Sequence, residues 1–344
     1  MFTSLLDKLS RRQDLSVEEA AAAMARIMEG SASPAEISGL LVGLAMKGEQ
    51  TSEIVGLARA MRAHALRLPA SFAPLVDLCG TGGDRAGTFN ISSVASVVTA
   101  ACGARVAKHG NRAVSSACGS ADLFEALGVR TTAPPEVVAR CLEEAGIAFL
   151  FAPVFHPSMR HAAAVRRELG LRTAFNLLGP LTNPAGPTHQ LVGVPRPELT
   201  ELVAHALLLL GCRRAWVVHG ADGLDEISTT GYSKVSECRD GAVRTFYVHP
   251  SDFGLRVAAP AALSGGSVQA NARIAILVLC GEPGPARDVV LLNAGAALFL
   301  AGLAPSVPDA VRRAAVAIDR GDARRTLERM AALSRDGACD EAAT

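Results

Sequence analysis

Aromatic residues are scarce in this chain, at 4% of its 344 residues, with one Trp and two Tyr. The charge also lacks a dominant sign, because 34 Lys and Arg stand against 33 Asp and Glu. Proteins that bind nucleic acid normally carry a clear basic excess, and those that bind single strands also present stacking aromatics. Both shortages argue against a nucleic-acid partner, although a neutral total can still hide a local basic pocket.

No stretch is apolar over the roughly 20 residues that span a bilayer. The most apolar one, residues 289–304, is interrupted by Asn293, and we expect a buried helix there. The first residues, MFTSLLDKLSRRQ, lack the apolar centre of a signal peptide. The eight cysteines form no CxxC pair and fit no zinc motif, which favours reduced thiols over disulfide bonds. We therefore expect a cytoplasmic protein with no membrane partner.

The first 67 residues have the pattern of short helices. Ser16 with Glu19, and Ser33 with Glu36, form two capping boxes ahead of apolar runs with helical spacing. A further helix is expected over residues 51–66. Three or four such helices predict a small bundle, and LRLPASFAP is the expected linker to the rest of the chain.

Beyond the linker, short apolar runs alternate with helical segments, which is typical of a largely parallel sheet covered by helices. The expected strands include LVDLC, ARVAKHG, IAFLF and AWVVHG. Residues 226–248 are expected to form a strand pair that turns at Asp240–Gly241, and the chain after Ser267 to be mostly helical. The predicted class is α/β: a small N-terminal all-helical domain and a larger domain with a mostly parallel central sheet flanked by helices.

The first motif with chemical content follows the strand LVDLC and reads GTGGD, then TFNISS. Glycines let backbone N–H groups approach a phosphate, and a helix starting at about Asn90 adds partial positive charge. Ser92 and Ser93 supply hydroxyls at the same place. The loop matches neither GxGxxG nor GxxxxGK[ST], so a Rossmann site and a P-loop are not supported. The alternative is a tight strand-to-helix turn capped by Asn90.

A second polar loop, KHGNRAVSSACGSAD at residues 108–122, also follows a strand and precedes a helix. Lys108 suits a phosphate as a point charge, and Arg112 suits it as a planar fork. Two glycine-bearing loops at one edge of a sheet lie where open α/β sheets bind ligands. A solvated loop is the alternative.

A third loop, HGADGLDE, follows the strand AWVV and ends in Asp225 and Glu226. Adjacent carboxylates can hold Mg²⁺, which prefers oxygen ligands and keeps waters and substrate phosphates. Asp-Glu is also a common surface pair, so the metal interpretation depends on the neighbouring phosphate-type loops.

A fourth stretch runs from HPSMR through RRELG to FNLLGPLTNP, at residues 156–184. Arg166 is a candidate clamp for a substrate carboxylate, or else part of a solvated basic face. His156 is as consistent with packing at a helix start as with a functional role.

In this order, GTGGD, KHGNR, GSAD, RRELG, FNLLGPLTNP and HGxDGLDE resemble the anthranilate phosphoribosyltransferases of tryptophan biosynthesis. The resemblance continues to NARIAILVL and RDVVLLNAGAAL, so it covers nearly the whole chain. It implies transfer of the 5-phosphoribosyl group from phosphoribosyl pyrophosphate to anthranilate, giving N-(5-phosphoribosyl)anthranilate and pyrophosphate. This is the second step of tryptophan synthesis from chorismate.

The resemblance also implies an organisation. A small helical domain of residues 1–67 is joined by helices from about 156–184, and residues 74–155 and 185–344 form the large domain that binds phosphoribosyl pyrophosphate. The protein is expected to be a cytoplasmic homodimer, formed through the helical domain, with two Mg²⁺ per subunit.

Site residues follow from the same resemblance. Those implied for phosphoribosyl pyrophosphate are Gly80, Gly83, Asp84, Thr88, Asn90, Ile91, Ser92, Ser93, Lys108, His109, Gly110, Asn111, Arg112, Ala113, Val114, Ser115, Ser116 and Ser120. Those implied for anthranilate are Gly80, Asn111, Arg166, His109 and Pro180, and those for Mg²⁺ are Ser92, Asp225 and Glu226. No firm catalytic base is assigned, because an arylamine is already unprotonated at neutral pH; His109 is the one candidate to accept the departing proton.

Three positions depart from the family pattern. Ser93 stands where threonine is frequent, Ala113 where serine is frequent, and Ala117 where a basic residue is frequent. The two alanines put side-chain contacts from those positions in doubt, but not backbone contacts.

Two other functions were weighed against this one. A pyrimidine nucleoside phosphorylase-like enzyme shares single motifs, and GTGGD, RRELG and the Asp225–Glu226 pair argue against it. A non-enzymatic paralogue that binds single-stranded nucleic acid is opposed by the near-neutral charge and the few aromatics.

Overall fold

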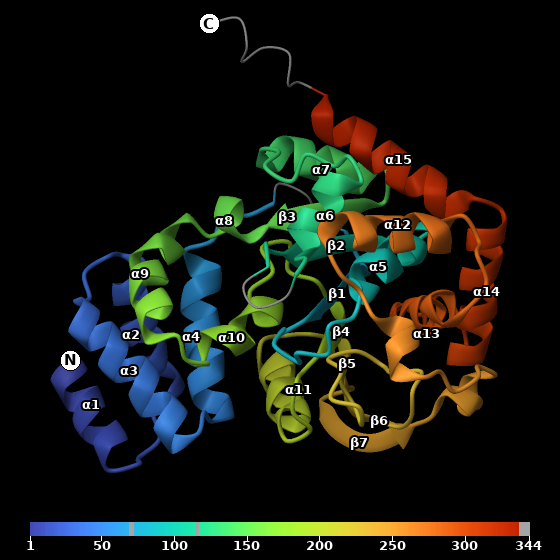
Figure 1. Ribbon diagram of the computed structural model, residues 1–344. Coiled ribbons are helices and arrows are strands. Elements are labelled where there is room, and N and C mark those ends of the chain that lie inside the picture. The colour runs from blue at the N-terminus through green and yellow to red at the C-terminus, as the bar shows by residue number, and fades with distance from the viewer. Residues whose placement is uncertain (69–71, 114–116, 337–344) are drawn as a thin grey trace, which may run out of the picture.

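The computed structural model describes residues 1–68, 72–113 and 117–336. Figure 1 shows a helical lobe beside a larger lobe built around a sheet. Four helices open the chain: α1 (Phe2–Ser10), α2 (Val17–Met28), α3 (Pro34–Lys47) and α4 (Thr51–Ala63). Both predicted capping boxes are present. Helix α4 ends before the predicted Leu66, because the Leu66 N–H is donated to the Phe155 carbonyl instead of continuing the helix.

Seven strands form one sheet in the order β3–β2–β1–β4–β5–β6–β7. Their bounds are β1 Leu75–Gly80, β2 Arg105–Gly110, β3 Ile147–Phe151, β4 His189–Gly193, β5 Arg214–Gly220, β6 Ser233–Arg239 and β7 Ala242–Val248. Strands β3, β2, β1, β4 and β5 are parallel, whereas β6 and β7 pair antiparallel. The mostly parallel sheet confirms the predicted α/β class.

Two details of the strand prediction needed correction. Strand β4 was not predicted, because its sequence opens with His189 and Gln190, and polar residues are unusual in a central strand. The predicted strand pair starts at Ser233 rather than at Glu226, since the chain between them forms a loop at the sheet edge. The predicted turn is confirmed: Asp240 and Gly241 both have positive φ, at 52° and 79°, as a two-residue hairpin requires.

The remaining helices cover the two faces of the sheet, except that α9 and α10 pack on the N-terminal helices. They are α5 Ile91–Ala101, α6 Ser120–Ala126, α7 Pro135–Glu144, α8 Ala152–Phe155, α9 Arg160–Leu169, α10 Phe175–Leu178, α11 Leu199–Leu209, α12 Val268–Leu279, α13 Pro285–Leu300, α14 Val307–Asp319 and α15 Asp322–Arg335. Helix α13 is the predicted buried apolar helix. Within the described ranges, no helix has the length and apolarity needed to cross a membrane.

Among the described residues, side chains of the strands contribute to three cores, and alternate residues of β5 enter two of them. On β5, Trp216 and Val218 belong to the core under α5, α13 and α14, whereas Ala215 and Val217 belong to a core shared with α11 and the N-terminal helices. Helices α5, α12, α13, α14 and α15 lie together on one side of the sheet in Figure 1, and the helical lobe lies on the other. The helical lobe therefore shares a hydrophobic core with one face of the sheet, and the linker is not its only connection to the larger lobe.

Candidate active site

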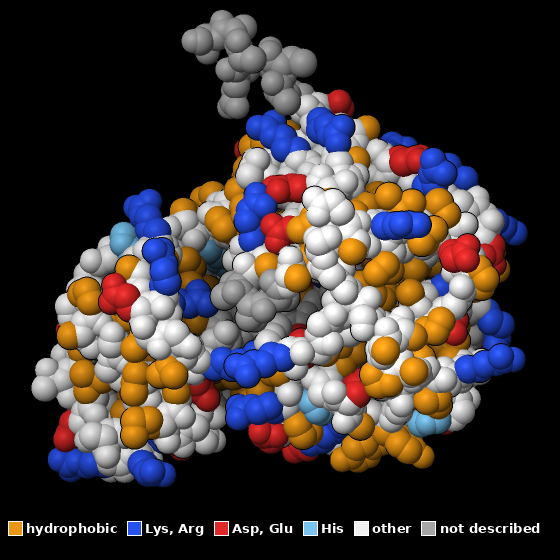
Figure 2. Space-filling model, in the orientation of Figure 1, with side chains coloured by type: hydrophobic (Ala, Val, Ile, Leu, Met, Phe, Trp, Pro, Cys, Tyr) orange, Lys and Arg blue, Asp and Glu red, His pale blue; other side chains and the backbone are white. Residues whose placement is uncertain are grey.

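The predicted loops meet at the carboxyl edge of the parallel strands. Strand order reverses beside β1, because the chain proceeds to β2 and β3 on one side and later to β4 and β5 on the other. Ligands of open α/β sheets bind at such a reversal. The Thr81 N–H donates to the Gly193 carbonyl at 2.9 Å, and the Gly82 N–H donates to Asp225 Oδ2 at 2.8 Å. Figure 2 shows the surface hollowed between the two lobes, with Lys and Arg side chains beside the hollow.

Asp225 and Glu226 lie on the loop after β5 and face the loop after β1. Glu226 is buried, and its Oε1 accepts the Ser92 N–H at 3.0 Å, at the start of α5. Burial raises the pKa of Glu226 to about 7, against the opposing effect of Lys108. Burial also raises the pKa of Asp225 well above its usual range, and the carboxylates of Asp84 and Glu226 add to that rise. The loops thus concentrate negative charge, which a nearby buried cation offsets at Glu226.

Lys108 is that cation. It lies on β2 with 2% of its surface exposed, and its Nζ donates to the Leu78 carbonyl at 2.6 Å and to Ser92 Oγ at 3.3 Å. A lysine that is this buried is rare unless it is paired. Its contact with Ser92 joins it to the start of α5, where the helix dipole also favours an anion.

Two glycines permit this close approach of loops. A Cβ on Gly80 would overlap the Asp225 carboxylate, so any larger residue would displace the proposed metal ligand. Gly83 has φ of 77°, a conformation that favours glycine, and a Cβ there would overlap the guanidinium of Arg172. The glycines of GTGGD are therefore explained by packing at this site as well as by access to phosphate.

Most of the other residues of the first loop form hydrogen bonds or packing contacts with other parts of the protein. Asp84 Oδ1 accepts the Ala86 N–H at 3.3 Å, and Thr88 forms an isolated bridge with Ser264. Asn90 occupies the position before α5 but does not cap it; its Nδ2 donates to the Cys118 carbonyl at 2.9 Å. The suggested Asn90 cap is thus wrong, because the amide ties two site loops together. Ile91 and Ser93 are buried in α5, which leaves Ser92 as the hydroxyl nearest the carboxylates.

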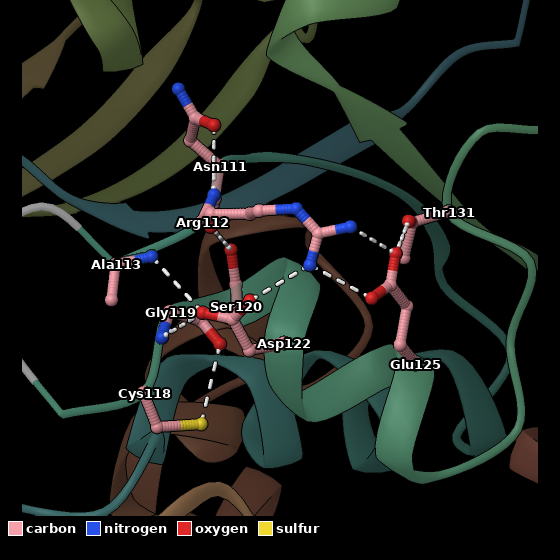
Figure 3. Close-up of polar contacts among 9 residues, drawn as sticks. All are labelled: Asn111, Arg112, Ala113, Cys118, Gly119, Ser120, Asp122, Glu125 and Thr131. Carbon is pink, nitrogen blue, oxygen red and sulfur yellow. Dashed lines mark hydrogen bonds and ion pairs between the residues drawn. The ribbon is translucent and has the colours of Figure 1, made fainter.

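The second loop is anchored by ion pairs at its outer side (Figure 3). The Arg112 guanidinium donates to Asp122 at 2.9 Å and to Glu125 at 2.7 and 2.8 Å, so it is committed to α6. The Ala113 N–H is donated to Asp122 Oδ2, and Ser120 Oγ donates to the Asn111 carbonyl. Figure 3 shows the Asn111 side chain directed away from these pairs. Val114, Ser115 and Ser116 lie outside the described residues.

His109 and His156 form a buried imidazole pair next to the loop that carries Pro180. Their ring centroids are 5.2 Å apart, and His109 Nδ1 lies 3.1 Å from the Gly179 carbonyl. Burial lowers the pKa of His109 to about 3 and that of His156 to about 4. Both Nε2 atoms are buried and lack a hydrogen-bond partner among the described residues. These imidazoles are neutral at physiological pH, and their lowered pKa values make both of them weak bases.

Arg166 reaches the same region from α9. Its guanidinium lies 4.8 Å from the centroid of the Phe175 ring, a cation–π contact that holds the side chain in place. Burial lowers its pKa. The Pro180 carbonyl accepts Gln190 Nε2 at 2.8 Å, which fixes the segment after α10 against β4. The structure gives no direct contact between Arg166 and Asn111.

A divalent cation fits the carboxylate pair. The described residues contain no cluster of three or more His, Cys, Asp or Glu side chains arranged to hold a metal. However, the pKa values of Asp225 and Glu226 are raised first by burial and then by neighbouring carboxylates, Asp84 for both groups and Glu226 for Asp225, and a cation relieves both effects. Mg²⁺ commonly takes one or two carboxylates and completes its shell with water and substrate phosphates. The donor set therefore suits a metal that arrives with a diphosphate.

Three residues around the site were not predicted as such: Asp77, Asn183 and Arg172. Asp77 is buried inside β1, where its Oδ2 accepts Asn183 Nδ2 at 2.8 Å. Arg172 Nη2 donates to the Gly82 carbonyl at 2.9 Å from the segment between α9 and α10. Asn183 and Arg172 meet their partners only through the tertiary fold. A charged residue in the apolar run LVDLC was the one signal that the sequence offered.

Comparison with known proteins gives a consistent result over the whole chain. Residues 73–324 match the model of the glycosyl transferase family a/b domain, and residues 3–65 match that of the helical bundle domain of the same family. The anthranilate phosphoribosyltransferase of Moorella thermoacetica is 55% identical over 332 residues, covering 96% of this chain and 98% of that protein.

Solved structures agree. The crystal structure of anthranilate phosphoribosyltransferase from Thermus thermophilus is 47% identical with a TM-score of 0.91, covering 96% of this chain and 99% of that one. The Saccharomyces cerevisiae enzyme in complex with PRPP and Mg is 28% identical with a TM-score of 0.89, covering 97% of each chain. The same yeast enzyme in complex with 4-fluoroanthranilate is 26% identical with a TM-score of 0.86, covering 97% of this chain and 98% of that one.

Proposed function

The chain belongs to the anthranilate phosphoribosyltransferase family, and we propose that the loops around Gly80, Lys108 and Asp225 bind and align its two substrates. The enzyme transfers the 5-phosphoribosyl group from phosphoribosyl pyrophosphate to anthranilate, the second step of tryptophan synthesis from chorismate. The observation that carries the site assignment is the carboxylate pair facing a glycine-rich loop and a buried lysine.

The diphosphate is assigned to the loop after β1 and the start of α5. Gly80, Gly83, Asp84, Thr88 and the α5 start would contact phosphoribosyl pyrophosphate, together with the loop of residues 108–120. The α5 dipole and Lys108 both favour an anion there. Arg112 is the weakest member of this set, because its guanidinium is already engaged by Asp122 and Glu125.

Mg²⁺ is assigned to Ser92, Asp225 and Glu226, with two ions per subunit bound together with the diphosphate. When bound, the metal supplies positive charge that stabilises pyrophosphate as a leaving group. The yeast relative in complex with PRPP and Mg supports the identity of the ion.

Anthranilate is assigned to the side facing the helical lobe, near Asn111, His109, Pro180 and Arg166. The neutral His109–His156 pair supplies an apolar wall for the aromatic ring, and the cationic Arg166 suits the carboxylate. This placement positions the amine to attack from the face of the ribose opposite the leaving group.

The reaction then needs little acid–base chemistry. The amine nitrogen bonds to ribose C1 as the bond from C1 to the pyrophosphate oxygen breaks, and the nitrogen afterwards loses one proton. Lys108 and the loop N–H groups stabilise charge on the departing oxygen, so catalysis rests on positioning and electrostatics. His109 Nε2, buried and unpaired among the described residues, is the proposed proton acceptor.

The domain division and assembly follow the same assignment. Residues 1–67 with 156–184 are proposed as the small domain, supported by the packing of α9 on α2 and α3. A homodimer through this domain is supported by the apolar outer side of α3, where Met46 is 73% exposed, and by hydrophobic side chains over α1 and α3 in Figure 2. A cytoplasmic location is supported by the free thiols of Cys79, Cys102, Cys141, Cys212, Cys238 and Cys280.

Product analysis tests the function. Purified enzyme with phosphoribosyl pyrophosphate, anthranilate and Mg²⁺ should yield equal amounts of N-(5-phosphoribosyl)anthranilate and pyrophosphate by mass spectrometry and a pyrophosphate assay. Phosphorolysis of pyrimidine nucleosides without such product would contradict the assignment. Sedimentation of the wild type and of Met46→Glu tests the dimer: the variant should sediment as a monomer while the wild type does not.

A further inference from the structure

Arg172 spans from the helical lobe to the glycine-rich loop. It lies between α9 and α10, and its Nη2 donates to the Gly82 carbonyl at 2.9 Å. The same glycine donates its N–H to Asp225 Oδ2 at 2.8 Å. A single residue of the loop is therefore held on one side by a proposed metal ligand and on the other by a guanidinium.

The backbone around Arg172 is fixed on both sides. Gly170 ends α9 in the left-handed conformation, with φ of 59°, and its N–H is donated to the Arg166 carbonyl. The Thr173 N–H is donated to Asn176 Oδ1 at 3.0 Å, ahead of α10. Both Thr173 and Ala174 are buried. Because the segment is short and anchored, the exposed guanidinium is held within reach of the loop.

The guanidinium also lies against Gly83. A Cβ built on Gly83 would overlap it, so Arg172 occupies the space that a side chain would fill. A positive charge at this place is directly beside the loop whose backbone N–H groups are assigned to the diphosphate.

No acidic partner accounts for that charge. Over the described ranges, no carboxylate lies within ion-pair distance of Arg172, and the Gly82 carbonyl is its one hydrogen-bond partner. By contrast, Arg112 on the neighbouring loop is bound by two carboxylates. Most of the planar N–H fork of Arg172 is therefore available to a ligand, and this fork matches phosphate oxygens.

We propose that Arg172 is a further diphosphate-binding residue, which contacts the pyrophosphate group of phosphoribosyl pyrophosphate from the helical lobe. The inference rests on the proposed function of the site. It gives the helical lobe a direct part in binding the leaving group, in addition to its part in binding anthranilate. It also adds a second cation to Lys108, which offsets the charge of Glu226.

Two substitutions separate charge from hydrogen bonding. Arg172→Gln keeps an N–H donor for the Gly82 carbonyl but removes the charge, whereas Arg172→Lys keeps both the charge and a donor. Arg167→Gln, an exposed neighbour on α9, is the matched control. Calorimetric titration with pyrophosphate and Mg²⁺ gives the Kd, and steady-state rates give KM for each substrate.

Arg172→Gln should weaken pyrophosphate binding about tenfold, as expected for one lost charge-assisted hydrogen bond. It should raise KM for phosphoribosyl pyrophosphate similarly and leave KM for anthranilate within about twofold. Arg172→Lys keeps the charge but loses the planar fork, so it should weaken pyrophosphate binding less than Arg172→Gln does, with a salt dependence that resembles that of the wild type. Arg167→Gln should match the wild type throughout.

Pyrophosphate affinity of Arg172→Gln within twofold of the wild type overturns the proposal. Equal weakening in the glutamine and lysine variants also overturns it, because the contact would then serve only the shape of the loop. A wild type that binds pyrophosphate but does not convert anthranilate would contradict the proposed function instead, so the two failures are distinguishable. Circular dichroism verifies that the exposed substitution leaves the fold intact.

Discussion

Substitution of Asn183 tests how the strands that carry the site loops are held together. Its side chain is 2% exposed and makes three hydrogen bonds: Nδ2 to Asp77 Oδ2 and to the Ala107 carbonyl, both at 2.8 Å, and Oδ1 from the Ala185 N–H at 2.9 Å. These bonds join β1, β2 and the segment that precedes β4. We expect Asn183→Ala to uncouple that segment from the strands that carry the site loops.

The size of the expected loss of stability follows from the burial of these hydrogen bonds. A hydrogen bond to a charged group contributes about 1.5–3 kcal/mol, and each neutral one about 1 kcal/mol. Losing all three, with Asp77 left in a buried strand, should lower the free energy of unfolding by about 3.5–5 kcal/mol. Asn176→Ala is the matched control, because Asn176 is half-buried and accepts one backbone N–H. It should cost about 1 kcal/mol.

The loss of unfolding free energy in Asn183→Ala, relative to the wild type, should also depend on pH. Burial raises the pKa of Asp77, and Lys108 and Asn183 oppose that rise. Without the Asn183 amide the folded pKa rises further, so the folded variant takes up its proton at a higher pH than the wild type. Because that uptake favours the folded state, the deficit should shrink as the pH falls from 7 to 5. Urea unfolding followed by circular dichroism at both pH values measures this. A deficit below about 0.5 kcal/mol, or one equal to that of Asn176→Ala, refutes the reasoning.

Three further predictions concern single contacts. His156 has a pKa lowered to about 4, so the free energy of unfolding of the wild type decreases as the pH falls from 6.5 to 4. His156→Gln should remove about 1.4 kcal/mol of that loss per pH unit. Urea unfolding that gives the variant and the wild type the same dependence of this free energy on pH would contradict the prediction. Gly80→Ala should displace the Asp225 carboxylate and weaken Mg²⁺-dependent pyrophosphate binding about tenfold by calorimetry; unchanged affinity would argue against Asp225 as a ligand. Arg112→Ala should cost less than about 1 kcal/mol in thermal unfolding, because its ion pairs are exposed, and a loss above about 2 kcal/mol would show a larger role.

Local signals in the sequence predicted much of the fold. The capping boxes at Ser16 and Ser33 formed as expected, since each depends on residues three positions apart. The Asp240–Gly241 turn and the loops after β1, β2 and β5 were also recognisable, because glycine and polar residues interrupt apolar runs there. Loops that follow parallel strands must share one edge, so their meeting was predictable without coordinates.

Features that depend on contacts between distant segments were not predictable. Strand β4 was missed because Gln190, which is fully buried, donates its amide N–H to the Pro180 carbonyl rather than to solvent. Asn90 was suggested as a helix cap, yet its amide bonds Cys118 and Asn271, which lie far along the chain. The Arg172–Gly82 contact joins residues 90 positions apart, and no local pattern marks it.

The most direct test of the central claim is the loss of anthranilate fluorescence when phosphoribosyl pyrophosphate and Mg²⁺ are added. The wild type should show a Mg²⁺-dependent loss, and a folded Asp225→Asn/Glu226→Gln double variant should not, because it lacks the carboxylates assigned to the metal. No loss with well-folded wild type would contradict the function. An equal loss in the double variant would contradict the assignment of Asp225 and Glu226.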